Sequence, residues 1–205
     1  RPGHADLAGG MKYNQDDLRN ILERASARET AARVAAGALA RALLARLGVQ
    51  LGSEVLEIGS VAAKARPLTS YSSDETWQEL EGLDQSPLRC ADKTAEREML
   101  SAIEQARENG DSLGGTFRVA ARGLVPGLGS HVHWDRRLDG RLAQALMSIG
   151  SVKAVWVGLG KEAASLPGSR VHDPISYHGE YVRESNNAGG LEGGITTGEP
   201  LILGA

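Results

Sequence analysis

Leucines spaced four residues apart form the clearest hydrophobic pattern of the chain. Leu39 and Leu43 belong to this pattern within residues 26–47, where many alanines widen the apolar face. Ser26 and Glu29 have the Ser-x-x-Glu spacing of a capping box, so we expect the helix to begin at or near Ser26. The pattern predicts a core helix whose small side chains allow neighbouring backbones to approach on more than one side.

Further helices and strands alternate along the rest of the chain. Helices are predicted over 94–108 and 136–150, and strands over 49–60 (broken at Gly52), 115–124, 151–160 and 200–205. Residues 62–92 hold prolines and a Ser/Thr-rich turn, and we interpret them as a surface excursion with a short helix near Trp77. Helices mixed with strands in this way predict a single α+β core.

Glycine is unusually frequent, with 26 residues in a chain of 205. Paired glycines stand close together in "NNAGGLEGGITTG" (186–198), where the absent side chains would let the backbone approach a flat ligand. A glycine-rich hairpin without a ligand explains the same sequence. Both interpretations stay open at this point.

Composition and charge exclude several classes of function. Three Trp, four Tyr and one Phe are too few for the stacking surfaces that bind single-stranded nucleic acid. The lone Cys90 excludes an internal disulfide and a zinc site built from cysteines, which fits a reducing cytoplasm. We find no apolar run long enough to span a membrane and no signal segment at the start.

Basic residues gather near the start of the chain although the net charge is -3. The first fifty residues hold eight Lys/Arg against five Asp/Glu, so we expect an anionic ligand there. Arg24 and Arg28 flank Ser26 at a predicted helix N-terminus, a suitable place for phosphate or carboxylate. Solvated arginines beside a simple cap are the alternative. His4 is a candidate proton donor there, and the alternative is a structural or solvent-exposed histidine.

Two other motifs provide weaker indications of a binding site. His131 and His133 alternate like strand residues and Asp135 follows, but no further ligand has a known metal-site spacing, so we predict no metal site. The segment "GLVPGLGS" lacks the Gly-Lys-Ser/Thr ending of a phosphate loop, and we predict a turn.

Taken together, the motifs resemble the chorismate synthase family over nearly the whole chain. "RPGHAD", "RASARETAARVAAGA", "GLVPGLGS", "LDGRLAQALMSI" and "NNAGGLEGGI" occur in the family's order and approximate spacing. The resemblance implies a β-α-β sandwich with central helices between antiparallel sheets, a homotetramer and a cytoplasmic location. It also implies a lyase that eliminates phosphate from 5-enolpyruvylshikimate 3-phosphate to give chorismate in the shikimate pathway, with reduced FMN as cofactor.

The resemblance also assigns roles to individual residues. It implies that His4 is catalytic, that Arg1 and Arg28 bind substrate, and that Arg24, Ala25, Ser26, Gly150, Ser151 and Gly193 bind the flavin. Gly150 and Ser151 depart from the family's usual pair, so their contact with flavin depends on the backbone. NADPH is a possible reductant of the flavin.

The family's N-terminal "GESHG" segment and its C-terminal flavin-site segments have no counterpart among these residues. We therefore expect residues 1–205 to be a single core domain truncated at both ends and to be inactive alone. A non-catalytic fragment or pseudoenzyme that serves only in assembly is the alternative. A second alternative is a generic flavin reductase, which would oxidise NAD(P)H without releasing phosphate.

Overall fold

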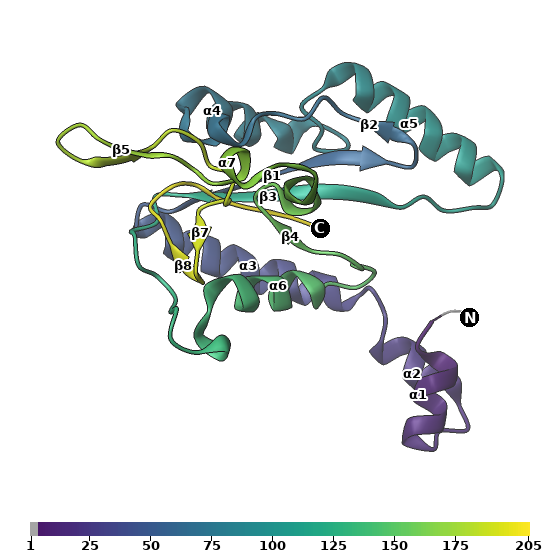
Figure 1. The fold of residues 1–205 in the computed structure, drawn as a ribbon. Helices are drawn as coiled ribbons and strands as arrows, with labels where there is room; N and C mark the ends of the chain where they lie inside the picture. The colour runs from purple at the N-terminus through teal and green to yellow at the C-terminus, as the bar shows by residue number, and fades with distance from the viewer. Residues whose placement is uncertain (1–3) are drawn as a thin grey trace. The chain divides into compact units, whose positions relative to one another are not determined.

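The computed structural model describes residues 4–205 (Figure 1). The chain divides into two compact units, the first ending at Leu44 and the second running from Ala45 to Ala205. No helix within the described residues is both long and apolar enough to cross a membrane.

The first unit contains helices only. They are α1 (Asp6–Tyr13), α2 (Leu18–Arg24) and most of α3 (Glu29–Arg46). Two glycines of α1 lie against α2, because a methyl group on Gly9 would clash with Ile21 and one on Gly10 would clash with Leu18. Close packing of these two short helices therefore depends on glycine.

The start of α3 differs from the predicted capping box. The helix begins at Glu29, and Ser26 lies in the preceding turn, where its hydroxyl oxygen accepts from the Arg28 amide at 3.3 Å. The Glu29 carboxylate binds Arg24 at 3.3 Å and Arg33 at 3.1 Å. Two arginines thus replace the backbone partner that the Ser-x-x-Glu spacing predicts for this carboxylate.

The leucine face of α3 is also more exposed to solvent than predicted. No residue of α3 is buried, and Leu39 and Leu43 are 76% and 65% exposed. The predicted burial of this face is therefore not seen, because a leucine period identifies an apolar helix face without identifying what covers it.

An antiparallel sheet of five strands forms the centre of the second unit. Its strand order is β2-β1-β3-β9-β4. The strands are β1 (Gln50–Ile58), β2 (Val61–Ala62), β3 (Gly115–Arg122), β4 (Trp156–Val157) and β9 (Leu201–Gly204). The predicted break at Gly52 is absent, since Gly52 pairs with Ala120 and an irregularity in register lies between Val55 and Glu57 instead.

Helices and small hairpins complete the second unit. The helices are α4 (Asp74–Gly82), α5 (Lys93–Glu108), α6 (Leu138–Met147) and α7 (Gly168–Val171), with short 3-10 turns at Leu68–Ser72, Leu83–Gln85, Trp134–Arg136 and Gly160–Ser165. The hairpins pair β5 (Ile175–Tyr177) with β6 (Tyr181–Arg183) and β7 (Leu191–Glu192) with β8 (Ile195–Thr196). Helices with antiparallel sheets make the fold α+β, as predicted. The predicted strand over 151–160 shrinks to the two residues of β4.

Residues 62–92 form part of the core, so their interpretation as a surface excursion was wrong. Tyr71, Trp77 and Leu80 are each at most 2% exposed and cluster with Ala120 and Ile202 of the sheet. The prolines and the Ser/Thr-rich turn of this stretch are typical of surface segments, so the composition conceals the burial of these large side chains. It therefore covers one face of the sheet.

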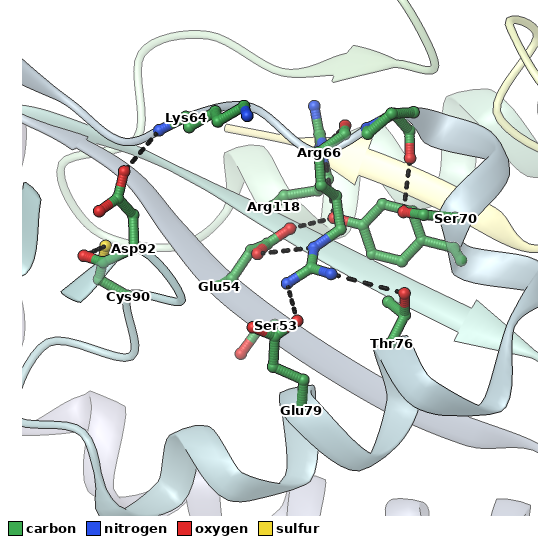
Figure 2. A network of polar contacts seen from close by, with 12 residues as sticks. Ser53, Glu54, Lys64, Arg66, Ser70, Thr76, Glu79, Cys90, Asp92 and Arg118 are labelled. Carbon is green, nitrogen blue, oxygen red and sulfur yellow. Dashed lines mark hydrogen bonds and ion pairs between the residues drawn. The ribbon is translucent and has the colours of Figure 1, made fainter. Parts of the chain in front are cut away.

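Asp92 caps α5 and links it to a distant loop (Figure 2). Its carboxylate accepts from the amides of Thr94 at 2.9 Å, Ala95 at 3.1 Å and Lys64 at 3.2 Å. The Ala95 amide, followed by those of Lys64 and Thr94, lowers the pKa of Asp92. The ionised carboxylate thus stabilises the folded state above the ordinary Asp pKa of about 3.9.

We expect Asp92→Asn to be less stable than the wild type at pH 7 and to approach it as the pH falls. The wild type loses its advantage as Asp92 becomes protonated through its lowered pKa, below about pH 4. Urea unfolding of both proteins at pH 7 and pH 3 measures this effect. A stability difference of the same size at both pH values would contradict it.

Candidate functional site

His4 and Asp6 form a hydrogen-bonded pair in the first unit. The Nδ1 atom of His4 lies 2.8 Å from Oδ1 of Asp6, which is 5% exposed and begins α1. Asp6 therefore holds the imidazole by one nitrogen and favours the tautomer with the proton on Nδ1. Nε2 of His4 makes no hydrogen bond within residues 4–205, so this nitrogen can exchange a proton with a ligand.

The predicted anion pocket lies in the turn between α2 and α3. Arg24 ends α2, Ala25 is its C-cap, and Ser26 and Arg28 follow in the turn. Arg24 is bound to Glu29, whose pKa is lowered by Arg33 first and by Arg24 second. Part of the positive charge of this pocket is therefore already neutralised by the protein.

Arg28 differs from Arg24 in having no carboxylate partner. Within residues 4–205 its guanidinium makes no hydrogen bond or ion pair. The amide of Ala31 donates to the Arg28 carbonyl and that of Thr30 to the Ala27 carbonyl, so these amides of the helix start are already used. Of the anion-binding groups predicted in this turn, the Arg28 side chain is the available one. Arg1, the other predicted substrate ligand, lies outside the described residues.

Gly193 lies at the tip of the β7–β8 hairpin in the second unit (Figure 1). Gly193 and Gly194 form its two-residue turn, with φ of 58° and 89°, as a primed hairpin turn requires. A Cβ on Gly193 would meet no atom closer than the Cβ of His131 at 3.9 Å. The glycine-rich hairpin is thus real, and at Gly193 its backbone is open to the approach of a flat group.

Buried Thr196 joins this hairpin to the "GLVPGLGS" turn. Its hydroxyl donates to the Val125 carbonyl at 2.7 Å and accepts from the Leu128 amide at 2.8 Å. The Gly194 carbonyl accepts from the amide of Leu138, the first residue of α6, at 2.8 Å. Segments about seventy residues apart in sequence are therefore brought together around Gly193.

Asn186 and Asp173 fix the glycine loop that precedes the hairpin. Asn186 is 2% exposed and donates to the Pro200 carbonyl while accepting from the Gly190 amide, both at 2.8 Å. Asp173 accepts from the amides of Asn187 at 2.7 Å and Ala188 at 3.0 Å. No pattern in the sequence predicts roles for these side chains or for Thr196, because their partners are distant in sequence.

Gly150 and Ser151 lie in an exposed turn that follows α6. Ser151 has a φ of 72°, and the amides of both residues make no hydrogen bond within the described part of the chain. Two backbone donors are therefore available to a ligand at this turn. Gly193 lies near the start of α6, so a helix about 15 Å long separates the two predicted flavin contacts.

The histidines at 131 and 133 do not form part of a metal site in the described chain. Among residues 4–205, no group of three or more His, Cys, Asp and Glu side chains is placed to hold a metal ion. His133 instead lies 3.8 Å from Asp135, and both side chains are exposed. "GLVPGLGS" forms a turn, as predicted.

Comparisons with known proteins agree on one family. The family model described as chorismate synthase matches residues 1–205. A chorismate synthase of Moorella thermoacetica is 58% identical over 100% of this chain and 52% of its own length. One of Brevibacillus brevis is 56% identical over 99% of the chain and 51% of its own length. The chain thus spans about half the length of these curated relatives.

A solved structure shows the same similarity in three dimensions. The crystal structure of a chorismate synthase superposes with a TM-score of 0.92 and 49% sequence identity. The match covers 98% of this chain and 61% of the crystallised one.

Proposed function

The chain belongs to the chorismate synthase family, and on this basis we propose that it provides part of the active site of a chorismate synthase. The proposed reaction is the anti-1,4-elimination of phosphate from 5-enolpyruvylshikimate 3-phosphate to give chorismate, with reduced FMN bound. The observation that supports the proposal is the His4–Asp6 pair, because it leaves one imidazole nitrogen open to proton exchange on the histidine to which the family resemblance assigns a catalytic role.

His4 transfers a proton through Nε2 while Asp6 holds Nδ1. The nearly buried carboxylate fixes the ring orientation and the tautomer that carries its proton on Nδ1. A group of this kind suits a step in which an anionic partner gains or loses a proton. We assign this role to His4 at the departing phosphate or at the flavin.

Arg28 binds an anionic group of the substrate in this proposal, and Arg1 is assigned the same role. The substrate carries a phosphate and two carboxylates, and an arginine without a carboxylate partner provides a planar set of donors for either group. Arg24, Ala25 and Ser26 are assigned to the flavin. The Arg24–Glu29 ion pair limits the positive charge that this turn presents.

The second unit is suited to hold an elongated flavin. Gly193 has space above its Cα atom, and Gly150 and Ser151 offer amide donors about one helix length away. Reduced FMN, when bound, supplies electron density to the substrate and assists removal of the C6 hydrogen. NADPH is proposed as a source of the reduced flavin. From the resemblance to the family, we also propose that the protein is a homotetramer and that it is located in the cytoplasm.

Gly193→Ala is expected to weaken FMN binding by about tenfold or more while the protein stays folded. The methyl group would occupy the open space above Gly193, and the φ of 58° adds a strain of about 1–2 kcal/mol. Fluorescence titration with FMN measures the affinity, and urea unfolding measures the stability. Gly127→Ala is a matched control, because this glycine also has a positive φ and open space around it. Equal FMN affinity in both variants would contradict the assignment of Gly193.

The proposed function is tested with the full-length protein, chemically reduced FMN and 5-enolpyruvylshikimate 3-phosphate in the absence of oxygen. We expect inorganic phosphate and chorismate to appear in equal amounts. Folded protein without phosphate release would support the non-catalytic alternative. A separate assay with oxidised FMN, NAD(P)H and 5-enolpyruvylshikimate 3-phosphate tests the flavin reductase, which NAD(P)H oxidation without phosphate release would support.

A further inference from the structure

Backbone pairing holds the "GLVPGLGS" turn along β8 in the second unit. The amide of Thr196 donates to the Leu128 carbonyl at 2.9 Å. One residue further along each segment, Gly129 forms an antiparallel β-bridge with Ile195. The last residues of the turn therefore lie beside the tip of the β7–β8 hairpin.

Close backbone contacts fix the position of His131, which directly follows this turn. A Cβ on Gly129 would clash with the Gly194 carbonyl oxygen, and one on Gly194 would lie 3.0 Å from the Ser130 carbonyl oxygen. After His131, the amide of Val132 donates to Oγ of Ser130 at 3.2 Å. The chain on both sides of His131 is thus held next to the hairpin.

His131 flanks the open space above Gly193. Apart from the chain neighbours of Gly193, the Cβ atom of His131 is the heavy atom nearest to the position of a Cβ on this glycine, at 3.9 Å. The same space is assigned above to the flat ring of the flavin. A ligand that lies on the Gly193 backbone therefore comes within reach of the His131 side chain.

No partner within residues 4–205 holds the imidazole of His131. The side chain is exposed and makes no hydrogen bond or ion pair among these residues. His133, two residues further along, instead lies 3.8 Å from Asp135. An exposed ring without a partner exchanges among its staggered rotamers. His131 is therefore available for a contact with a ligand.

We propose that His131 is a flavin-binding residue, whose imidazole packs against the isoalloxazine ring system where that ring lies on Gly193. This inference rests on the proposed function, because it takes the space above Gly193 to be the flavin site. Flat aromatic groups attract one another in offset or edge-to-face contact, and the contact also shields apolar ring surface from water. His131 thus provides one wall of the flavin site and Gly193 provides another.

His131→Ala in the full-length protein should weaken FMN binding by about three- to tenfold, because it removes this aromatic contact. His131→Phe keeps a flat aromatic ring and should bind FMN within about twofold of the wild type. His133→Ala is the matched control, since it removes the neighbouring exposed histidine and should change the affinity by less than about twofold. Fluorescence titration with FMN measures all four proteins. Equal FMN affinity in the wild type and His131→Ala would overturn the proposal.

Gly193→Ala separates this inference from the proposed function. If FMN affinity falls in Gly193→Ala but not in His131→Ala, the role of His131 is overturned and the flavin site at Gly193 stands. If neither variant changes the affinity, both assignments are overturned. If both weaken binding, His131→Ala should have a smaller effect in the Gly193→Ala background than alone, because the added methyl group already keeps the ring from its place. Fully additive effects would contradict a shared contact with one ring.

A measurement on the wild type tests the contact directly. In protein labelled with ¹³C-histidine, FMN should shift the ring resonances of His131 through the ring current of the isoalloxazine, and those of exposed His133 and His178 should stay in place. The signal that disappears in His131→Ala identifies His131. Inorganic phosphate alone should leave this signal in place, because it has no aromatic ring. Unshifted His131 resonances at saturating FMN would overturn the proposal.

Discussion

His4→Ala in the full-length protein is expected to lower the rate of phosphate elimination by roughly 10²–10⁴-fold. The substitution removes the imidazole that Asp6 orients through a contact of 2.8 Å between Nδ1 and Oδ1. His4 itself is partly exposed, so its loss leaves no cavity in a packed core. The rate should therefore fall much more than the thermal midpoint of unfolding.

Stopped-flow measurement of chorismate formation, with FMN already reduced, provides the rate. His178→Ala is the matched control, because His178 is an exposed histidine in the β5–β6 turn and should leave the rate unchanged. Asp6→Asn should keep the ring and lose its negative partner, giving a smaller loss than His4→Ala. An unchanged rate in His4→Ala would remove the catalytic role of His4 and favour the non-catalytic alternative.

Gly189→Ala is expected to destabilise the protein by about 2–5 kcal/mol, through left-handed strain together with overpacking. Gly189 has a φ of 64°, and a Cβ there would lie 2.6 Å from the Cα atom of Gly158 and 2.8 Å from the Ile202 carbonyl oxygen. These are backbone atoms of β9 and of the segment after β4, so relief requires movement of the sheet edge rather than of a side chain.

Urea unfolding at equilibrium measures this loss of stability. Gly193→Ala is the matched control, because its φ of 58° is similar and its Cβ would have no neighbour closer than 3.9 Å. The difference between the two variants isolates the clash from the strain. Similar stabilities for both would show that the loop around Gly189 adapts and that the close contact with Gly158 is not required.

Regular periodicity predicted the helices and strands with the strongest patterns. The helices at 93–108 and 138–147 and the strands at 50–58 and 115–122 lie where the predicted segments are. The core role of Trp77 and Leu80 was missed, because the burial of a short helix depends on the sheet that it covers, and that sheet is distant in sequence. In residues 62–92, local composition therefore predicts the turns correctly but predicts the solvent exposure of the side chains incorrectly.

The candidate site, like the fold, was predicted only in part from the sequence. The motif around His4 identified the histidine, whereas the part played by Asp6 required a distance between two side chains. Thr196 and Asn186 bind groups up to 71 residues away, and no pattern within a segment contains that information. Arg28 and Arg24 looked equivalent in the sequence, and the Glu29 ion pair now distinguishes them.

The ten residues of α6 impose a length requirement on any ligand that contacts both of its ends. Gly193 lies at one end and the Gly150–Ser151 turn at the other, roughly 15 Å apart along the helix axis. A bare isoalloxazine ring is too short to reach both, whereas a ring with a ribityl phosphate chain has the necessary extent. In the proposed enzyme, α6 would therefore act as a molecular ruler that favours the mononucleotide over shorter flavins.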